Sequence, residues 1–132
     1  MGRSRYSSVN LLNLFVVAAG GAIGSAARYL LSQFVHRTTA TMFPLGTFAV
    51  NLLGCIVFGA IAGAAEQRVP LAPPLRAFLL VGILGGFTTF SSYAFESFVL
   101  MRDGQFLMAS MNIVGQVVAG LAGVWVGFAL AR

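Results

Sequence analysis

The sequence predicts an all-α membrane protein with four transmembrane helices, and three observations support this class. Hydrophobic residues make up 58% of the 132 residues and charged residues only 8%, whereas soluble domains carry about 25% charged residues. Four apolar stretches reach the roughly 20 residues that a spanning helix needs. The connections between them are only a few residues long, so neighbouring helices should run antiparallel. We expect a single transmembrane domain over residues 1–132, with spans at about 11–34, 43–65, 75–99 and 106–131.

The first expected span combines glycines with an arginine near its end. Gly20 and Gly24 have the small-xxx-small spacing of closely packed membrane helices. Arg28 has two interpretations: it extends to the lipid headgroups, or it faces inward and attracts anions to a pore mouth. The same glycine spacing recurs in the second and fourth spans, at Gly59 and Gly63 and at Gly123 and Gly127.

The second expected span starts near Pro44, a residue that suits the first turn of a helix. Thr47 and Asn51 follow one turn apart and therefore share a face. The Asn51 amide offers two N–H donors and an acceptor without a charge, which suits an ion path. The alternative is an ordinary hydrogen bond between helices. Cys55, the single cysteine, is interpreted as a small packing residue.

The third expected span contains the most informative segment, Gly82–Tyr93, with a double glycine and a run of hydroxyl groups. Gly85 and Gly86 should weaken the helix, so we predict a break in mid-membrane. Lipid cannot satisfy an unwound backbone, which must therefore face protein or water. Ion and substrate sites are commonly built at such breaks, where free carbonyl groups suit a small cation. The hydroxyls that could bond the freed backbone are those of Thr88, Thr89, Ser91 and Ser92.

Three further residues of the third span are candidates for contact with an ion. Phe90 and Tyr93 share a helix face, and the electropositive edges of aromatic rings can contact an anion. Ordinary packing is the alternative. Glu96 follows by one turn; an acid at membrane depth is costly unless it is paired, and Arg28 is a possible partner.

The fourth expected span carries a stripe of neutral amides, because Asn112 and Gln116 lie one turn apart. Such a stripe suits a dehydrated ion that moves by exchanging hydrogen bonds. The spans contain no nucleophile–base pair and no phosphate-binding loop, so we do not expect an enzyme. Donors and aromatic rings favour a small anion, although they do not separate fluoride from chloride or water.

The arginines give a weak prediction of orientation. By the positive-inside rule, the side shared by both termini should face the cytoplasm, with a bias small enough for insertion either way round. Four short helices leave no room for a wide pore, so the path should run between subunits or along a surface groove, in a dimer. Arg3, Arg5, Arg68, Arg76 and Arg132 fall on the side of the termini, whereas Arg37 and Arg102 fall on the other.

Three motifs resemble those of the Fluc or CrcB fluoride channels. The first is Gly20-Gly21-x-x-Gly24 with the Arg28-Tyr29 pair that follows it, and the second is Gly46-Thr47-x-x-x-Asn51. The third, Gly85-Gly86-Phe87-Thr88-Thr89-Phe90-Ser91, is similar to the signature of that family's broken third helix. The resemblance covers most of the chain.

The resemblance implies an antiparallel, dual-topology homodimer in the cell (inner) membrane, with two pores that passively export cytoplasmic fluoride. It also implies a structural sodium ion at the dimer centre, held by the backbone carbonyls of Gly85 and Thr88 and not transported. Arg28 and Glu96 would then be charges at the pore mouth or within the structure. Residues expected along the conduction path are Asn51, Phe90, Tyr93, Thr47, Ser92, Asn112 and Gln116.

The chain departs from the family pattern at two positions. Tyr93 stands where the family usually has Phe, and its hydroxyl adds a donor and bulk. Gln116 stands near a usual Ser, close to Asn112. A small multidrug-type exporter is the alternative function, although such a protein needs an acid in its first helix, and Glu96 lies in the third. A membrane assembly subunit without transport activity is a further alternative.

Overall fold

The computed structural model describes residues 10–67 and 71–132, and these residues form helices joined by short connections. Four helical segments are long and apolar enough to cross a membrane, and the third is bent. The expected class of four spans is therefore confirmed, with helices that extend slightly beyond the apolar stretches. The four segments are Leu11–Thr38, Leu45–Glu66, Pro73–Arg102 and Phe106–Ala131.

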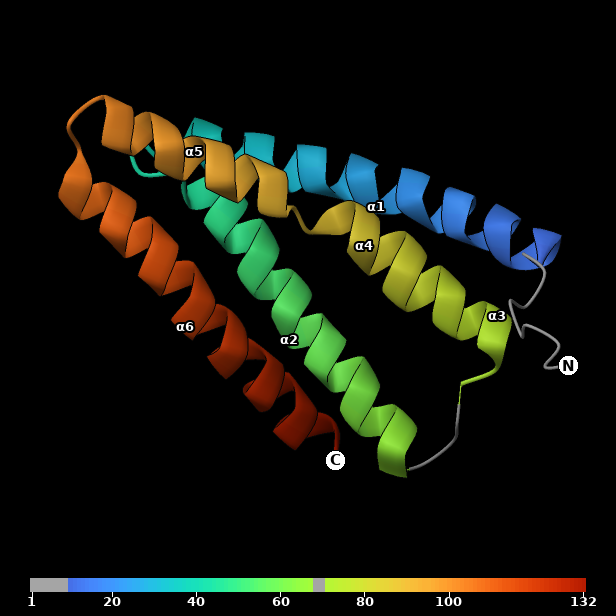
Figure 1. Ribbon diagram of the computed structural model, residues 1–132. Helices are drawn as coiled ribbons and strands as arrows, with labels where there is room; N and C mark the ends of the chain where they lie inside the picture. Colours follow the sequence, from blue (N-terminus) through green and yellow to red (C-terminus); the bar gives the residue numbers. More distant parts are fainter. Residues whose placement is uncertain (1–9, 68–70) are drawn as a thin grey trace, which may run out of the picture.

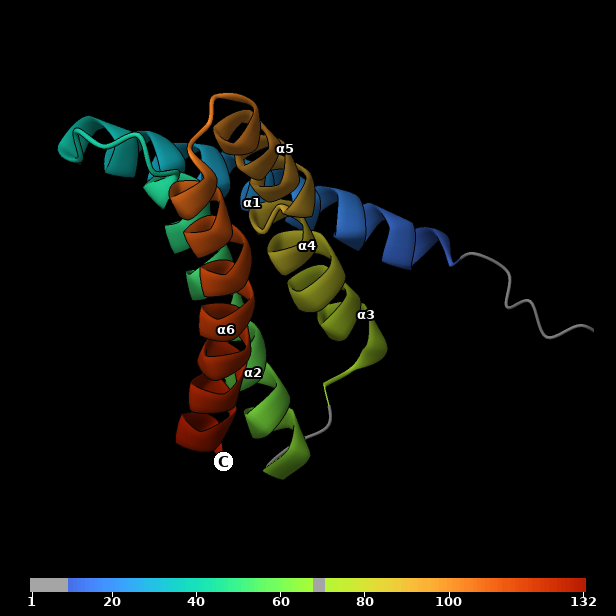
Figure 2. The same cartoon turned by 60° about the vertical axis from the view of Figure 1, so that its left-hand side comes forward.

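Three of the spans are continuous helices. The amide of Asn10 caps the first one by accepting a hydrogen bond from the Leu12 N–H at 3.0 Å, which satisfies one of the free donors of the first turn. The second and fourth pack side by side along their length, and the first crosses them steeply (Figures 1 and 2). These helices are α1 (Leu11–Thr38), α2 (Leu45–Gln67) and α6 (Phe106–Ala131).

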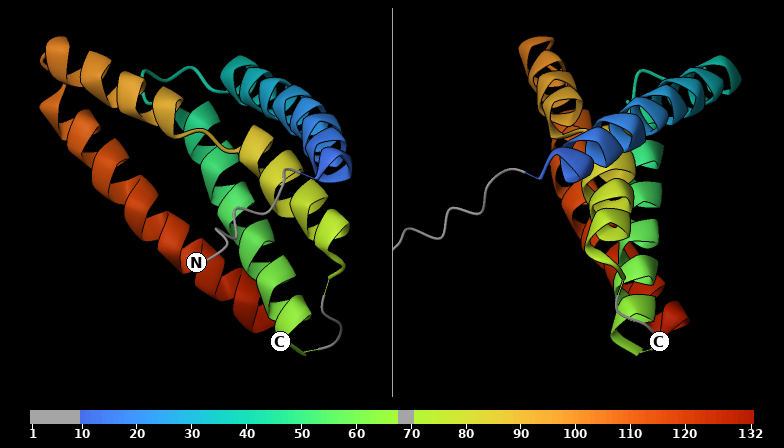
Figure 3. Two further views of the ribbon diagram at one scale, coloured as in Figure 1. Left: turned by 45° about the vertical axis from the view of Figure 1, so that its right-hand side comes forward. Right: turned by 90° about the vertical axis from the view of Figure 1, so that its right-hand side faces the viewer.

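The third span is divided into two halves that pack on different neighbours. Its first half packs on α1, and its second half packs against α6, with the interruption between them visible in Figure 3. Much of the first half has π-helical hydrogen bonding, a form that occurs frequently at functional sites. The first half comprises α3 (Pro73–Arg76), η1 (Ala77–Leu84) and α4 (Gly85–Phe87), and the second half is α5 (Phe90–Arg102).

Glycines set the close approach of the helices within the chain. A methyl group added to Gly20 would lie 2.6 Å from the Phe78 carbonyl oxygen, and one on Gly63 would lie 2.6 Å from the Phe128 carbonyl oxygen. Side chains at these positions would force the backbones apart. The small-xxx-small pairs therefore join α1 to the third span and α2 to α6, as expected of packing positions.

A tight turn joins α5 to α6. Gly104 has a φ of 76°, a conformation that glycine adopts without steric cost. The Gln105 N–H bonds to the Leu100 carbonyl at 2.8 Å, which closes the end of α5 in the manner of a helix C-cap. The short turn makes α5 and α6 an antiparallel hairpin.

The described helix ends agree with the expected arrangement of charges. The start of α1 and the ends of α2 and α6 lie towards one side of the molecule together with α3 (Figure 1). Arg76 and Arg132 are therefore on that side. Three of the arginines used to predict orientation, Arg3, Arg5 and Arg68, lie outside the described residues.

Few large side chains are buried within a single chain. Val50 is fully buried, whereas Phe90 is 79% exposed and Trp125 is 71% exposed. Such large exposed apolar side chains suit contact with lipid or with another protein. The molecule therefore has the surface of a membrane protein and not the core of a soluble domain.

Candidate ion-conduction site

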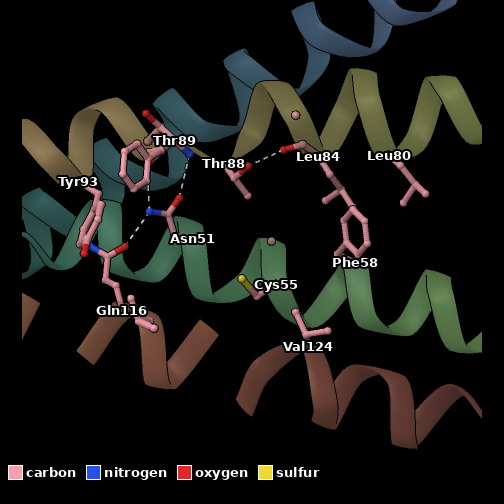
Figure 4. A pocket seen from close by; sticks show the side chains of 14 residues that line it. Asn51, Cys55, Phe58, Leu80, Leu84, Thr88, Thr89, Tyr93, Gln116 and Val124 are labelled. Carbon is pink, nitrogen blue, oxygen red and sulfur yellow. Dashed lines mark hydrogen bonds between the residues drawn. The ribbon is translucent and has the colours of Figure 1, made fainter. Parts of the chain in front are cut away.

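Asn51 of α2 lies at the point where the third span is broken. Its amide oxygen accepts the Thr89 N–H at 2.8 Å, and its Nδ2 donates to the Thr89 carbonyl at 3.1 Å and to Gln116 Oε1 at 2.7 Å. Figure 4 shows these bonds meeting at one side chain between three helices. One neutral amide thus satisfies the backbone of a broken helix and connects it to α6.

The break lies at Thr88 and Thr89, three residues beyond the double glycine expected to cause it. Gly85 and Gly86 themselves remain helical, and the break lies within the expected segment Gly82–Tyr93. Competing hydrogen bonds explain its position, because the Thr89 hydroxyl accepts the Ser92 N–H at 3.2 Å and caps α5. A side chain that offers the backbone such an alternative partner interrupts a helix where it lies.

The break leaves several carbonyl groups without their helical donors, among them those of Gly85 and Thr88. In a continuous α-helix the Thr89 N–H would bond to the Gly85 carbonyl and the Ser92 N–H to the Thr88 carbonyl. Here the Thr89 N–H donates to Asn51, and the Ser92 N–H donates to the Thr89 hydroxyl. The carbonyls of Gly85 and Thr88 are therefore available to a hard cation, which prefers such oxygen ligands.

A groove of about 510 Å³ opens in front of the break. The Phe90 ring is 79% exposed on it and lies 5.4 Å from the Tyr93 ring, measured between centroids, in a tilted pair. Apart from the amides and hydroxyls near the break, the groove is lined mainly by apolar side chains. Its lining residues include Asn51, Cys55, Phe58, Leu84, Gly85, Thr88, Thr89, Phe90, Tyr93 and Gln116.

A chain of side-chain hydrogen bonds runs from Asn51 into the interior between α5 and α6. Gln116 Nε2 donates to Asn112 Oδ1 at 2.9 Å, and Asn112 Nδ2 donates to Ser97 Oγ at 2.9 Å. The Ser97 hydroxyl in turn donates to the Tyr93 carbonyl at 2.8 Å. The expected amide stripe is thus a bonded network, in which Asn112 is fully buried and lines neither cavity.

The hydroxyl that distinguishes Tyr93 from phenylalanine is already bonded within the protein. It donates to the Ile113 carbonyl of α6 at 3.2 Å. The bond ties α5 to α6 and directs the hydroxyl into the helix hairpin. The ring, and not the hydroxyl, is thus the part of Tyr93 that is free to face an ion in the groove.

A second, more polar cavity of about 260 Å³ lies on the α1 side of the break. Glu96 and Arg28 line it together with Thr47 and Ser92. The Thr47 hydroxyl donates to Glu96 Oε1 at 2.6 Å, and Glu96 Oε2 is buried without a partner among the described residues. Arg28 shares the cavity, but the ion pair considered between Arg28 and Glu96 is not formed in the described structure.

Sequence reasoning missed two serines that support the site. Ser97 is 3% exposed and links Asn112 to the backbone of α5. Ser25 of α1 donates to the Gly86 carbonyl at 3.5 Å. The position of Ser97, one turn after Tyr93, was the available signal, because such a residue extends the polar face of α5.

Comparisons with known proteins agree with one another. A family profile described as "CrcB-like protein, Camphor Resistance (CrcB)" matches residues 15–128. A protein of Maridesulfovibrio salexigens named "Fluoride-specific ion channel FluC" is 49% identical over 116 residues, covering 88% of this chain and 92% of the relative. Proteins of the same name from Nitratidesulfovibrio vulgaris (strain Miyazaki F) and Methylobacillus flagellatus are 46% and 45% identical, over 90% and 92% of this chain and 96% of each relative.

Proposed function

Because this chain belongs to the CrcB family, we propose that it is a fluoride-selective channel that passively exports cytoplasmic fluoride and so relieves fluoride toxicity. It is a multi-pass membrane protein and a channel, not an enzyme. The observation that carries the proposal is the uncharged donor group at the break, where Asn51 lies in one groove with Phe90 and Tyr93. The names of the relatives point to the ion.

The chemistry of the groove suits a small anion that must lose its water. The Asn51 amide supplies N–H donors, and the tilted Phe90 and Tyr93 rings supply electropositive edges. None of these groups carries a charge, so an anion is attracted without being trapped. Fluoride is small and hydrogen-bonds strongly, so a path of amide, hydroxyl and ring-edge donors could replace its water, while the choice of fluoride over chloride rests on the names of the relatives.

A second copy of the chain is the proposed cover of the groove. Phe90 is too exposed for a path through a single chain to stay dry, and an antiparallel homodimer in the inner membrane would enclose it. The modest charge bias of the chain fits insertion in both orientations. The two symmetric grooves of the dimer would provide two pores.

The Gly85 and Thr88 carbonyls are the proposed ligands of a structural sodium ion. The hydrogen-bond pattern of the break fits this assignment, since both carbonyls have lost their helical donors. The ion would compensate the partial negative charge of these oxygens where two copies meet. It would stabilise the dimer and would not be transported.

The multidrug-type exporter is not favoured. Within its described residues, α1 contains no acid that could couple transport to protons. Glu96 of α5 is bonded to Thr47 in the smaller cavity. The observed acid therefore has a structural partner and lies in a different helix from the one this alternative requires.

Fluoride efflux from liposomes that contain the purified protein tests the proposal. The liposomes are loaded with potassium fluoride, and external fluoride is read with an electrode. We expect rapid efflux only after a potassium ionophore is added, because passive movement of F⁻ needs a balancing cation. Matched liposomes loaded with potassium chloride should retain their chloride.

The controls separate the alternatives. Liposomes without protein measure the background leak, and size-exclusion chromatography verifies that the protein is folded. No fluoride efflux from folded protein would overturn the channel proposal and favour an assembly subunit. Proton-driven uptake of a cationic dye in place of fluoride efflux would favour the exporter.

A further inference from the structure

Both donor hydrogens of the Asn51 amide are already used in the structure. One goes to the Thr89 carbonyl at 3.1 Å, and the other goes to Gln116 Oε1 at 2.7 Å. An amide nitrogen carries only two hydrogens. An anion that approaches Asn51 therefore finds no free donor and must replace one of these two acceptors.

The Gln116 bond is the one that an ion can replace. Thr89 is 8% exposed and its N–H also bonds to Asn51, so this pair closes a ring that holds the helix break. Gln116 lines the groove and contributes one acceptor from a flexible side chain. Losing this contact leaves the two Asn51–Thr89 bonds intact, and Asn51 need not move.

We propose that the side-chain oxygen of Gln116 occupies the anion position at Asn51 and that fluoride must displace it. The inference rests on the proposed channel function and deepens it by naming a residue that sets the apparent affinity. Gln116 Oε1 is a neutral acceptor placed against the donor that an anion would use. It therefore acts as a tethered competitor of the ion.

Displacing Oε1 moves the whole terminal amide of Gln116. Gln116 Nε2 donates to Asn112 Oδ1 at 2.9 Å, and because Oε1 and Nε2 belong to one planar amide, turning the oxygen out of the anion position also shifts this bond. Fluoride must therefore replace one hydrogen bond of Gln116 and disturb a second, and both effects favour the state without the ion.

The size of the effect follows from the strength of such bonds. Hydrogen bonds between side chains in membrane proteins average about 0.6 kcal/mol. At this strength the Asn51–Gln116 bond is broken in roughly a quarter of the molecules. The apparent affinity for a ligand falls by the fraction that is competent to bind it. Removing the competitor should therefore lower the half-saturating fluoride concentration about four-fold.

Initial efflux rates at a series of fluoride concentrations test this competition. Gln116→Ser removes the side-chain oxygen that bonds to Asn51, and we expect its half-saturating concentration to be about four-fold lower than that of the original chain. Val114→Ser is the matched control on the same helix, because Val114 is 59% exposed and lines neither cavity. This control should leave the half-saturating concentration unchanged.

The outcomes distinguish this inference from the function on which it rests. If the original chain conducts fluoride but Gln116→Ser has an unchanged half-saturating concentration, the proposed competition is overturned and the proposed channel function is retained. A lower maximal rate at unchanged half-saturation also overturns it, since that result indicates a supporting role. No efflux from the folded original chain overturns the channel proposal itself.

A spectroscopic measurement on the unaltered protein gives an independent decision if Gln116→Ser does not fold. The side-chain carbonyl ¹³C resonance of Gln116 in lipid bilayers, assigned by correlations along α6, should shift on titration with fluoride and stay fixed with chloride. A resonance that does not respond to fluoride would contradict displacement.

Discussion

At the scale of single residues, the site is built from neutral groups that bond to one another. Asn51 both supports the broken backbone and lines the same groove as the paired rings of Phe90 and Tyr93. The charged residues, Glu96 and Arg28, lie in a separate cavity. Uncharged donors can replace the water molecules that an ion loses, and because they carry no charge they do not hold the ion so tightly that it cannot leave.

Asn51→Asp should reduce fluoride efflux to the level of protein-free liposomes. The new carboxylate places a negative charge in the groove and removes the two N–H donors used by Thr89 and Gln116. Asn10→Asp is the matched control, because Asn10 only caps α1 and Asp caps equally well. Efflux from Asn51→Asp at the rate of the original chain would contradict a role in the path.

Tyr93→Phe should lower stability while leaving efflux within about a factor of two. The change removes the hydroxyl bond to the Ile113 carbonyl, which is worth about 0.6 kcal/mol on average in membrane proteins, and keeps the ring. Reversible unfolding in mixed micelles measures the loss of stability. Tyr29→Phe is the control, because Tyr29 is 64% exposed. A collapse of efflux would mean that the hydroxyl itself contacts the ion.

At the scale of elements, the third span is two half-helices that serve different neighbours. α4 and η1 pack on α1, whereas α5 packs on α6, and the break lies between these two contacts. Side-chain bonds from Asn51 and the Thr89 cap replace the missing backbone bonds. The break is therefore a stable joint and not a frayed segment.

The existence of the four spans and of the break followed from the sequence, but the exact position of the break did not. Hydrophobic length is a local property, so the spans could be predicted directly. The position of the break depends on which backbone groups bond to Asn51, a residue of another helix. A contact between helices cannot be seen in a one-dimensional pattern. For Ser97 the spacing from Tyr93 was a usable signal, but its bond to Asn112 on α6 was not predictable in this way.

Two glycines of α1 should respond in opposite ways to alanine. A methyl group on Gly24 would collide with the Ile83 carbonyl oxygen, whereas one on Gly21 would have nothing within 4 Å. Gly24→Ala should cost about 1–3 kcal/mol by overpacking, and Gly21→Ala should stabilise by about 0.5–1 kcal/mol. Unfolding in mixed micelles measures both, and equal effects would argue against this packing.

At the scale of the whole molecule, one chain leaves its own site open. The groove exposes Phe90 and the freed carbonyls of Gly85 and Thr88 lie beside it. Side chains that are this large and apolar stay exposed at membrane depth only against lipid or protein. The proposed dimer and sodium ion would complete the site from outside the chain; the sequence pattern indicated a dimer and a cation site in outline, whereas the antiparallel arrangement and the sodium ion came only from the family resemblance.

Removing sodium should shift the proposed dimer towards monomers. Replacing Na⁺ by a large organic cation leaves the Gly85 and Thr88 carbonyls uncompensated, and the monomer fraction in dilute vesicles, counted by single-molecule photobleaching, should rise at least several-fold. Thr88→Ser should keep the dependence on sodium, because its backbone carbonyl is retained. An unchanged monomer fraction would count against the central ion.

The double role of Asn51 has a practical consequence for protein engineering. Because the same amide holds the break and faces the groove, a library randomised at this position would mix misfolded variants with variants of altered selectivity. Phe90 offers a cleaner starting point, since its exposed ring has no hydrogen bond to lose. Searches for channels with new ion preferences should begin at that ring and keep the amide fixed.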